Sequence, residues 1–233
     1  MPLGISAGLA DGNNYLGNLA LNEETANQVD LGFSYQSAQL TIAPRIFYQS
    51  IQDYIVGSPS EDAVANMVST MMSGSSPLQW QNTDATIWGA DVLMTAQLTN
   101  RIDLGMTASW VRGTRDDLNQ PLYRIAPASL ITQLHWRDEN LTLSIESQLL
   151  ASQQQVSEIQ NESPSAGAGI INLSSQYRFN ENISVSFSAK NVFDKIYQTH
   201  LGGINCVAET DVAVGERLYE TGRELSANFT LLW

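Results

Sequence analysis

Strict alternation of apolar and polar residues constrains the fold of this chain more than any other feature. The clearest stretch sets Ile183, Val185, Phe187 and Ala189 against Ser184, Ser186, Ser188 and Lys190. Because successive side chains of a β-strand point to opposite faces, this period predicts a strand with one apolar and one polar face. The same pattern predicts about nine strands, near 25–37, 40–55, 90–98, 102–110, 128–137, 141–150, 172–179, 183–190 and 225–233.

The connections between these segments alternate in length. Short polar turns are expected at 36–39, 99–101, 137–140 and 180–182, and long connections at roughly 57–84, 113–126, 152–168 and 199–221. Short turns at one end and long loops at the other are typical of outer-membrane β-barrels. A polar face rich in Ser, Thr, Asn and Gln also favours a hydrated lumen. We therefore expect an all-β fold, an antiparallel meander of about nine transmembrane strands.

Composition argues against several other classes of protein. The formal net charge is −13, and a nucleic-acid partner is not expected, because binding phosphates requires Lys and Arg. The single cysteine, Cys206, excludes an intrachain disulfide and a cysteine-based zinc cluster. No stretch approaches the roughly 18 apolar residues of a spanning helix. Residues 1–4 lack the basic start of a signal peptide, so we expect the natural N-terminus to lie upstream.

Two segments resemble the TonB-dependent outer-membrane receptors. Residues 190–197, Lys-Asn-Val-Phe-Asp-Lys-Ile-Tyr, are similar to the Asn-Leu-Phe-Asp-Lys-x-Tyr signature near the last two strands of that family. Residues 17–25 resemble its Gly-Asn-x-x-Leu-Lys-Pro-Glu-Thr segment, with Asn-Glu in place of Lys-Pro. The resemblance covers essentially the whole chain. It implies the C-terminal portion of a 22-stranded outer-membrane β-barrel.

The resemblance also implies a function and a set of partners. Residues 1–233 would be a partial barrel domain, with the plug domain and the N-terminal strands absent. The full receptor would actively take up a metal chelate across the outer membrane of a Gram-negative bacterium, with a ferric siderophore as the leading cargo and copper as a second. Its partners would be the TonB complex acting through the plug, outer-membrane lipid and lipopolysaccharide, and the barrel-assembly machinery. No cofactor and no enzymatic activity are expected.

The signature segment has a structural interpretation. Asn191 and Asp194 are expected to satisfy backbone groups where a strand ends, and Phe193 and Tyr197 to anchor at the membrane interface. We expect these four residues to shape the barrel rim without touching cargo. Trp233, a terminal aromatic residue, is expected to act as an assembly signal. Other aromatic residues near strand ends suit an interface girdle: Tyr35, Phe47, Tyr48, Tyr54, Trp110, Trp136, Tyr177 and Phe179.

The long loops contain candidate ligands for a metal. If the segment around 64–72 forms a short helix, Met67 and Met71 lie on one face with Met72 beside them, and their thioethers suit copper. The alternative is that these methionines cover apolar surface or hold a greasy ligand. His200 and Cys206, in another outer loop, would add soft ligands. Four arginines expected in the lumen would bind an anionic chelate or pair with carboxylates: Arg45, Arg112, Arg115 and Arg124.

Two other protein classes share part of the pattern. A passive porin-like or structural outer-membrane barrel would alternate in the same way but would lack the receptor-type segments. A soluble β-sandwich binding module would need a second sheet over its apolar face. Catalysis has little basis, because His135 lies near a short turn and His200 in an outer loop, in different predicted layers.

Overall fold

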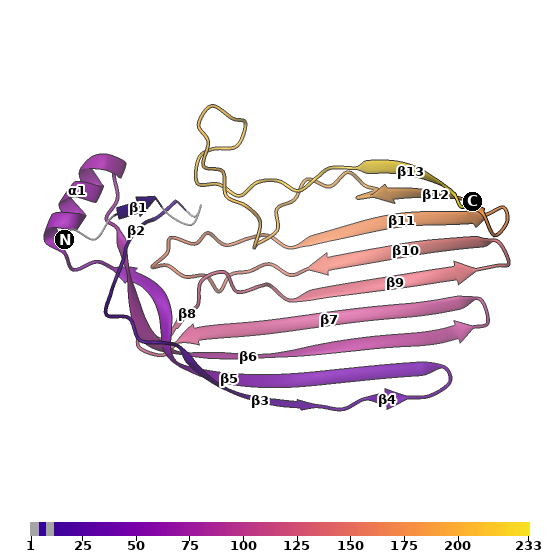
Figure 1. Ribbon diagram of the computed structural model, residues 1–233, viewed down its shortest axis with the longest axis horizontal. Coiled ribbons are helices and arrows are strands. Elements are labelled where there is room, and N and C mark those ends of the chain that lie inside the picture. Colours follow the sequence, from indigo (N-terminus) through magenta and orange to yellow (C-terminus); the bar gives the residue numbers. More distant parts are fainter. Residues whose placement is uncertain (1–4, 8–11) are drawn as a thin grey trace.

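A computed structural model describes residues 5–7 and 12–233 and forms an open antiparallel meander (Figure 1). Its strands of eight or more residues are β3 (Thr25–Gly32), β5 (Leu40–Pro59), β6 (Leu78–Thr99), β7 (Ile102–Arg115), β9 (Ser129–Arg137), β10 (Leu141–Leu150), β11 (Ala168–Arg178), β12 (Ile183–Lys190) and β13 (Glu224–Leu231). Each pairs antiparallel with the next, which confirms the all-β prediction of about nine strands. Within the described residues β3 pairs only with β5 and β13 only with β12, so both edges of the sheet are open.

Short elements decorate this sheet. The strand β4 (Tyr35–Gln36) pairs with β5 beyond the end of β3, and β8 (Gln120–Pro121) pairs with β7. Near the N-terminus β1 (Ile5–Ala7) and β2 (Asn14–Leu16) pair antiparallel, and β2 runs parallel to the start of β6. One helix, α1 (Ala63–Ser73), lies between β5 and β6. In the described part of the chain, no helix is long and apolar enough to cross a membrane.

The turns are sorted by length as predicted, with short turns at one end of the meander and long connections at the other (Figure 1). The predicted extent of the connection 57–84 is wrong, because β5 and β6 continue to pair as far as Pro59 and Leu78. Only 60–77 joins them. Residues 79–84 are mostly polar, so the alternation that predicts a strand is lost there. The backbone hydrogen bonds between two strands do not require an apolar face where water lies on both sides of the sheet. The last connection is longer than predicted, 191–223.

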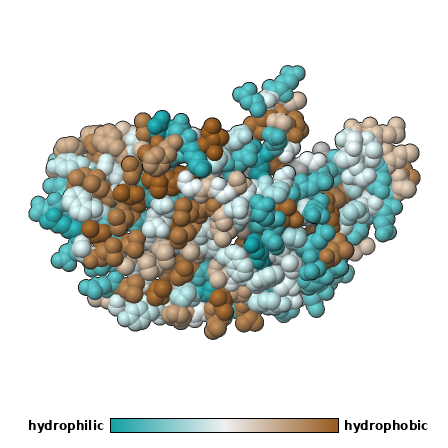
Figure 2. Space-filling view, turned by 180° about the vertical axis from the view of Figure 1, so that it is seen from behind, coloured by the Kyte–Doolittle hydropathy of each residue, from teal (hydrophilic) through white to brown (hydrophobic). Residues whose placement is uncertain are grey.

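Strand register collects the apolar side chains on one face. A single row of paired residues crosses eight strands: Leu40, Ala96, Leu104, Leu134, Ile145, Leu173, Ala189 and Leu225. The neighbouring row on the opposite face is polar throughout: Gln97, Asp103, His135, Ser144, Ser174, Ser188 and Ser226. Apolar side chains gather over the half of the sheet that has the short turns, and polar ones over the loop end (Figure 2). The sheet therefore has an apolar band.

The polar face is held by its own contacts. Arg45 Nη2 lies 2.8 Å from Asp91 Oδ2, which confirms the predicted pairing of Arg45 with a carboxylate. The carboxylate of Glu146 instead accepts hydrogen bonds from the side-chain amides of Gln133, Gln148 and Asn172.

Two aromatic residues depart from the predicted girdle. Tyr54 packs against the buried cluster of Ile51, Ala85 and Leu122. Phe47 lies on the polar face, because it is paired with Gly89, and a Cβ at Gly89 would stand 2.6 Å from the Phe47 ring. The Arg45 guanidinium sits 5.6 Å from the centre of that ring. The glycine leaves room for the ring, so Phe47 packs on the polar face of the sheet and is not part of a belt on the apolar face.

Candidate functional site

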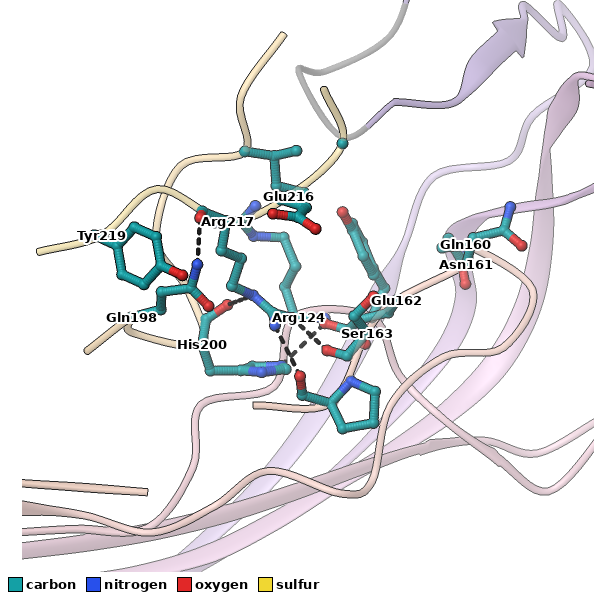
Figure 3. Close-up of a pocket in the computed structure, with 14 residues that line it drawn as sticks. Arg124, Gln160, Asn161, Glu162, Ser163, Gln198, His200, Glu216, Arg217 and Tyr219 are labelled. Atoms are coloured by element: carbon teal, nitrogen blue, oxygen red, sulfur yellow. Dashed lines mark hydrogen bonds and ion pairs between the residues drawn. The ribbon is translucent and has the colours of Figure 1, made fainter. Parts of the chain in front are cut away.

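Three of the long connections meet around a cavity of about 340 Å³ (Figure 3). They are the connection from β7 to β9 (116–128), the connection from β10 to β11 (151–167) and the connection from β12 to β13 (191–223). We call the residues that bind these connections together the loop junction: Arg124, Glu162, Ser165, His200 and Arg217. None of the three connections has regular structure of its own beyond β8 and isolated bridges. Their positions depend on contacts with one another.

Glu162 is the centre of the loop junction. Its side chain is 3% exposed and that of His200 is fully buried, with His200 Nε2 at 3.0 Å from Glu162 Oε1. The backbone N–H of Arg124 donates to the same oxygen (3.0 Å), and the backbone N–H of Ser157 donates to Oε2 (2.9 Å). Both carboxylate oxygens are thus occupied, which is what burial of a charged group requires.

His200 has partners at both ring nitrogens. Its Nε2–H donates to Glu162, and its Nδ1 lies 3.0 Å from the hydroxyl of Ser165. Burial lowers the pKa of His200, the Arg217 and Arg124 charges lower it further, and the Glu162 carboxylate opposes them. The imidazole is therefore neutral at neutral pH, accepts from the Ser165 hydroxyl, and has no lone pair left for a metal.

The two arginines of the loop junction are tied to backbone carbonyls. Arg217 donates from Nε to His200 O (3.0 Å) and from its two terminal nitrogens to the carbonyls of Pro164 and Ser163. Arg124 donates to Leu201 O, 77 residues further along the chain. In these contacts the guanidinium groups cross-link loops.

The other arginines predicted for the lumen have different surroundings. Arg115 is buried, and its Nε and Nη2 hold the carboxylate of Asp117 at 2.8 and 2.7 Å. The hydrogen bond from Arg115 lowers the pKa of Asp117. Arg112 Nη1 donates to Gln153 Oε1 (3.4 Å) and its guanidinium lies 5.7 Å from the Trp110 ring centre. The Arg115 side chain is buried, while that of its partner Asp117 is 43% exposed. By strand register Arg115, which is paired with Ala85, lies on the polar face. Arg112, paired with Trp88, lies on the face of the apolar row, so the predicted lumen position of Arg112 is wrong.

The signature segment folds into a tight corner at the end of β12. Asn191 is buried, with φ of 47°; its Oδ1 accepts from Lys195 N (2.9 Å) and its Nδ2 donates to the carbonyls of Lys195 (2.9 Å) and Thr221 (3.4 Å). Asp194 Oδ1 accepts from the backbone N–H of Arg223 (2.8 Å). Both side chains thus satisfy backbone groups where the ladder ends.

The aromatic residues of the signature segment and the terminal tryptophan differ in exposure. Phe193 is 77% exposed and Trp233 is fully exposed. Tyr197 is half-buried, and burial raises the pKa of its phenol. Anchoring by Phe193 and Tyr197, and assembly through Trp233, stay predictions.

The predicted helix is present as α1, but it buries a serine and exposes its methionines. Ser69 is buried, and the side-chain amide of Asn14 donates to Ser69 Oγ (3.0 Å). Met67, Met71 and Met72 are 58%, 80% and 81% exposed. Side chains of an ordinary surface helix are arranged the opposite way, with the apolar stripe toward the core. The methionines therefore do not fill a core in this structure.

The soft candidate ligands are not brought together. Cys206 is exposed on the last connection, which stands apart from α1 (Figure 1), and its Sγ approaches only Ile204 O, at 3.6 Å. His200 is enclosed in the loop junction. Across residues 5–7 and 12–233 no three His, Cys, Asp or Glu side chains are grouped to hold a metal ion.

Sequence reasoning missed most of the loop junction. Arg124 was singled out as a lumen arginine, and His200 as a soft ligand, but Glu162, Ser165 and Arg217 were not connected with them. The contacts between different connections join residues that are 35 to 77 positions apart, in segments without periodicity. No local pattern could have joined them.

Comparisons with known proteins agree on one architecture. A family model described as TonB dependent receptor-like, beta-barrel, matches residues 3–192. The solved structure of the copper transporter OprC is similar with a TM-score of 0.81 and 23% identity, over 91% of this chain and 32% of that one. The siderophore receptor PirA from Pseudomonas aeruginosa is similar with a TM-score of 0.62 and 20% identity, over 94% of this chain and 32% of that one.

A third structure, the FrpB iron transporter from Neisseria meningitidis, gives a TM-score of 0.65 and 14% identity, over 91% of this chain and 32% of that one. The chain thus spans about a third of the length of each of these proteins. A search of curated proteins found no match.

Proposed function

The chain belongs to the TonB dependent receptor-like β-barrel family, and on that premise we propose that it forms barrel wall and outer loops of an outer-membrane receptor that takes up a metal chelate. The observation that carries the proposal is the pair of adjacent rows across the meander, one wholly apolar and one wholly polar. In a spanning barrel the apolar row faces lipid and the polar row faces a hydrated lumen. The alternative of a passive porin-like barrel has no support in the comparisons.

The proposal includes parts that lie beyond these residues. An open sheet edge in lipid leaves backbone groups unpaired at several kcal/mol each. We propose that further strands close the barrel between β3 and β13, that a plug domain fills it, and that the TonB complex acts on that plug. Outer-membrane lipid, lipopolysaccharide and the barrel-assembly machinery are the other proposed partners. The coverage of about a third of each similar structure supports this division.

A ferric siderophore is the leading cargo. Siderophore receptors and an iron transporter are among the similar structures. Copper is the second cargo, and one specific observation favours it: α1 turns Met67, Met71 and Met72 outward at the loop end of the meander. Thioethers are soft ligands that select Cu(I).

Uptake by intact cells tests this function. In cells that express the intact receptor, we expect accumulation of either a radiolabelled ferric siderophore or radiolabelled copper, lost when TonB is deleted. Accumulation that persists without TonB would contradict the receptor and favour a passive pore.

Three leucine substitutions separate the two cargoes. If copper is carried, replacing Met67, Met71 and Met72 together by leucine should lower copper accumulation at least several-fold, because the shape is kept and the sulfur ligands are lost. Met94 lies on the apolar face of β6, away from α1, so Met94→Leu is the matched control and should leave uptake unchanged. Copper uptake that is unaffected by the triple substitution would exclude the methionines as its ligands.

A further inference from the structure

The loop junction holds three outer connections through one buried titratable pair. Three contacts at its centre join different connections: Glu162 to His200, Ser165 to His200, and Arg217 to the carbonyl of Pro164. The side chains of Glu162 and His200 are nearly or fully buried. We propose that the Glu162–His200 pair is a clasp that holds the outer loops together at neutral pH and releases them on acidification.

Charge balance explains why acid would open the clasp. Two guanidinium groups, those of Arg124 and Arg217, already face the imidazole from two different connections, and one buried carboxylate, Glu162, opposes them. The other ionisable groups that line the adjacent cavity are Tyr123, Glu216 and Tyr219. A proton on His200 would place a third positive charge beside a single buried carboxylate, where water cannot screen it.

The hydrogen bonds of His200 also favour the neutral imidazole in the closed clasp. With Nε2–H donating to Glu162, the neutral ring accepts from the Ser165 hydroxyl at Nδ1. A proton on Nδ1 would force that hydroxyl to turn from donor to acceptor. Protonation therefore disturbs the contact to the β10–β11 connection.

The sign of the pH dependence follows from the lowered pKa of His200. When the loops separate, the ring returns to water and to its ordinary value of 6.5. Separated loops then bind more protons than closed loops below that pH. The closed arrangement has its full stability above pH 6.5 and loses stability as the pH falls from 6.5 toward the lower pKa of the buried ring.

Distance measurement between two of the connections tests the clasp. Spin labels would be attached to Cys206 and to Glu158→Cys, both exposed, in the intact receptor. We expect one narrow distance distribution at pH 7.5. At pH 5.0 a broad component should account for most of the spin pairs. A distribution that stays narrow at pH 5.0 would overturn the proposal.

Two histidine variants test whether His200 is the group that makes the distance distribution depend on pH. His200→Gln keeps a donor to Glu162 but cannot titrate, so its distribution should stay narrow at both pH values. His135→Gln is the matched control, since His135 lies near the short turns and contacts Ser144, and it should broaden like the unmodified receptor. A loss of the response in His135→Gln, or a response in His200→Gln equal to that of the unmodified receptor, would refute the clasp.

If the distance distribution of His200→Gln is broad at both pH values, the pH dependence of the unmodified receptor and of His135→Gln tests the clasp. Both must then change with a single midpoint below pH 6.5. A midpoint above that value would contradict a histidine whose burial opposes protonation.

Discussion

Leu173→Arg should prevent the receptor from accumulating as a folded barrel in the outer membrane. Leu173 lies near the middle of β11, in the apolar row that crosses eight strands. An arginine on the lipid face of a barrel costs about 2–4 kcal/mol near the midplane of the bilayer. The folded fraction is measured by heat-dependent mobility of the outer-membrane protein in gel electrophoresis.

The neighbouring residue provides the matched control. Ser174 follows Leu173 directly and belongs to the polar row, so its side chain points to the opposite face. Ser174→Arg should leave the folded fraction close to that of the unmodified receptor, because a long charged side chain there extends into water. Equal losses for both substitutions would mean that β11 does not separate lipid from a lumen.

Asn191→Ala should destabilise the corner between β12 and the last outer connection by about 1–3 kcal/mol, the cost of leaving buried backbone groups unpaired. The amide of Asn191 satisfies Lys195 N–H and the carbonyls of Lys195 and Thr221. Its φ of 47° adds strain for alanine, because asparagine tolerates that region better. The denaturant dependence of unfolding in detergent measures the change.

Asn180→Ala is the control that shows how much of the effect of Asn191→Ala comes from burial of the hydrogen-bonded groups. The Asn180 Oδ1 also accepts from two backbone N–H groups, those of Asn182 and Ile183, but in an exposed short turn where water can replace it. Its loss of stability should be clearly smaller than that of Asn191→Ala. If the two variants unfold alike, the signature asparagine does not stabilise the corner in the way its contacts indicate.

Alternation predicted the strands that carry the apolar band, because lipid imposes an apolar side chain at every second position. It failed where that constraint ends. Residues 79–84 of β6 are mostly polar, and they pair with β5 through backbone hydrogen bonds. Such bonds do not require apolar and polar side chains to alternate, so the sequence carries no strand pattern there. Phe47 was misplaced for a related reason: an aromatic ring next to a strand end resembles an interface anchor until its cross-strand neighbour is found to be glycine.

The candidate site was predictable only in part. The signature around Asn191 is local, and the hydrogen bonds of Asn191 and Asp194 are ones that a short segment can make. The loop junction is different, since Glu162 and His200 are 38 residues apart and meet only because two strand pairs bring their loops to one end. The helix α1 could be predicted from the sequence, but the face that it exposes depends on the buried Ser69, whose hydroxyl accepts a hydrogen bond from Asn14 of β2.

Topology labelling tests the central claim most directly, namely that the meander crosses the outer membrane with its long loops outside. A membrane-impermeant thiol reagent would be applied to intact cells, with Cys206 in the last long connection as one site. Glu139→Cys in the short turn between β9 and β10, combined with Cys206→Ser, supplies the other. We predict that Cys206 is labelled on intact cells and that Glu139→Cys is labelled only after the outer membrane is opened. Equal labelling of the two sites on intact cells, or labelling of Glu139→Cys alone, would contradict the account.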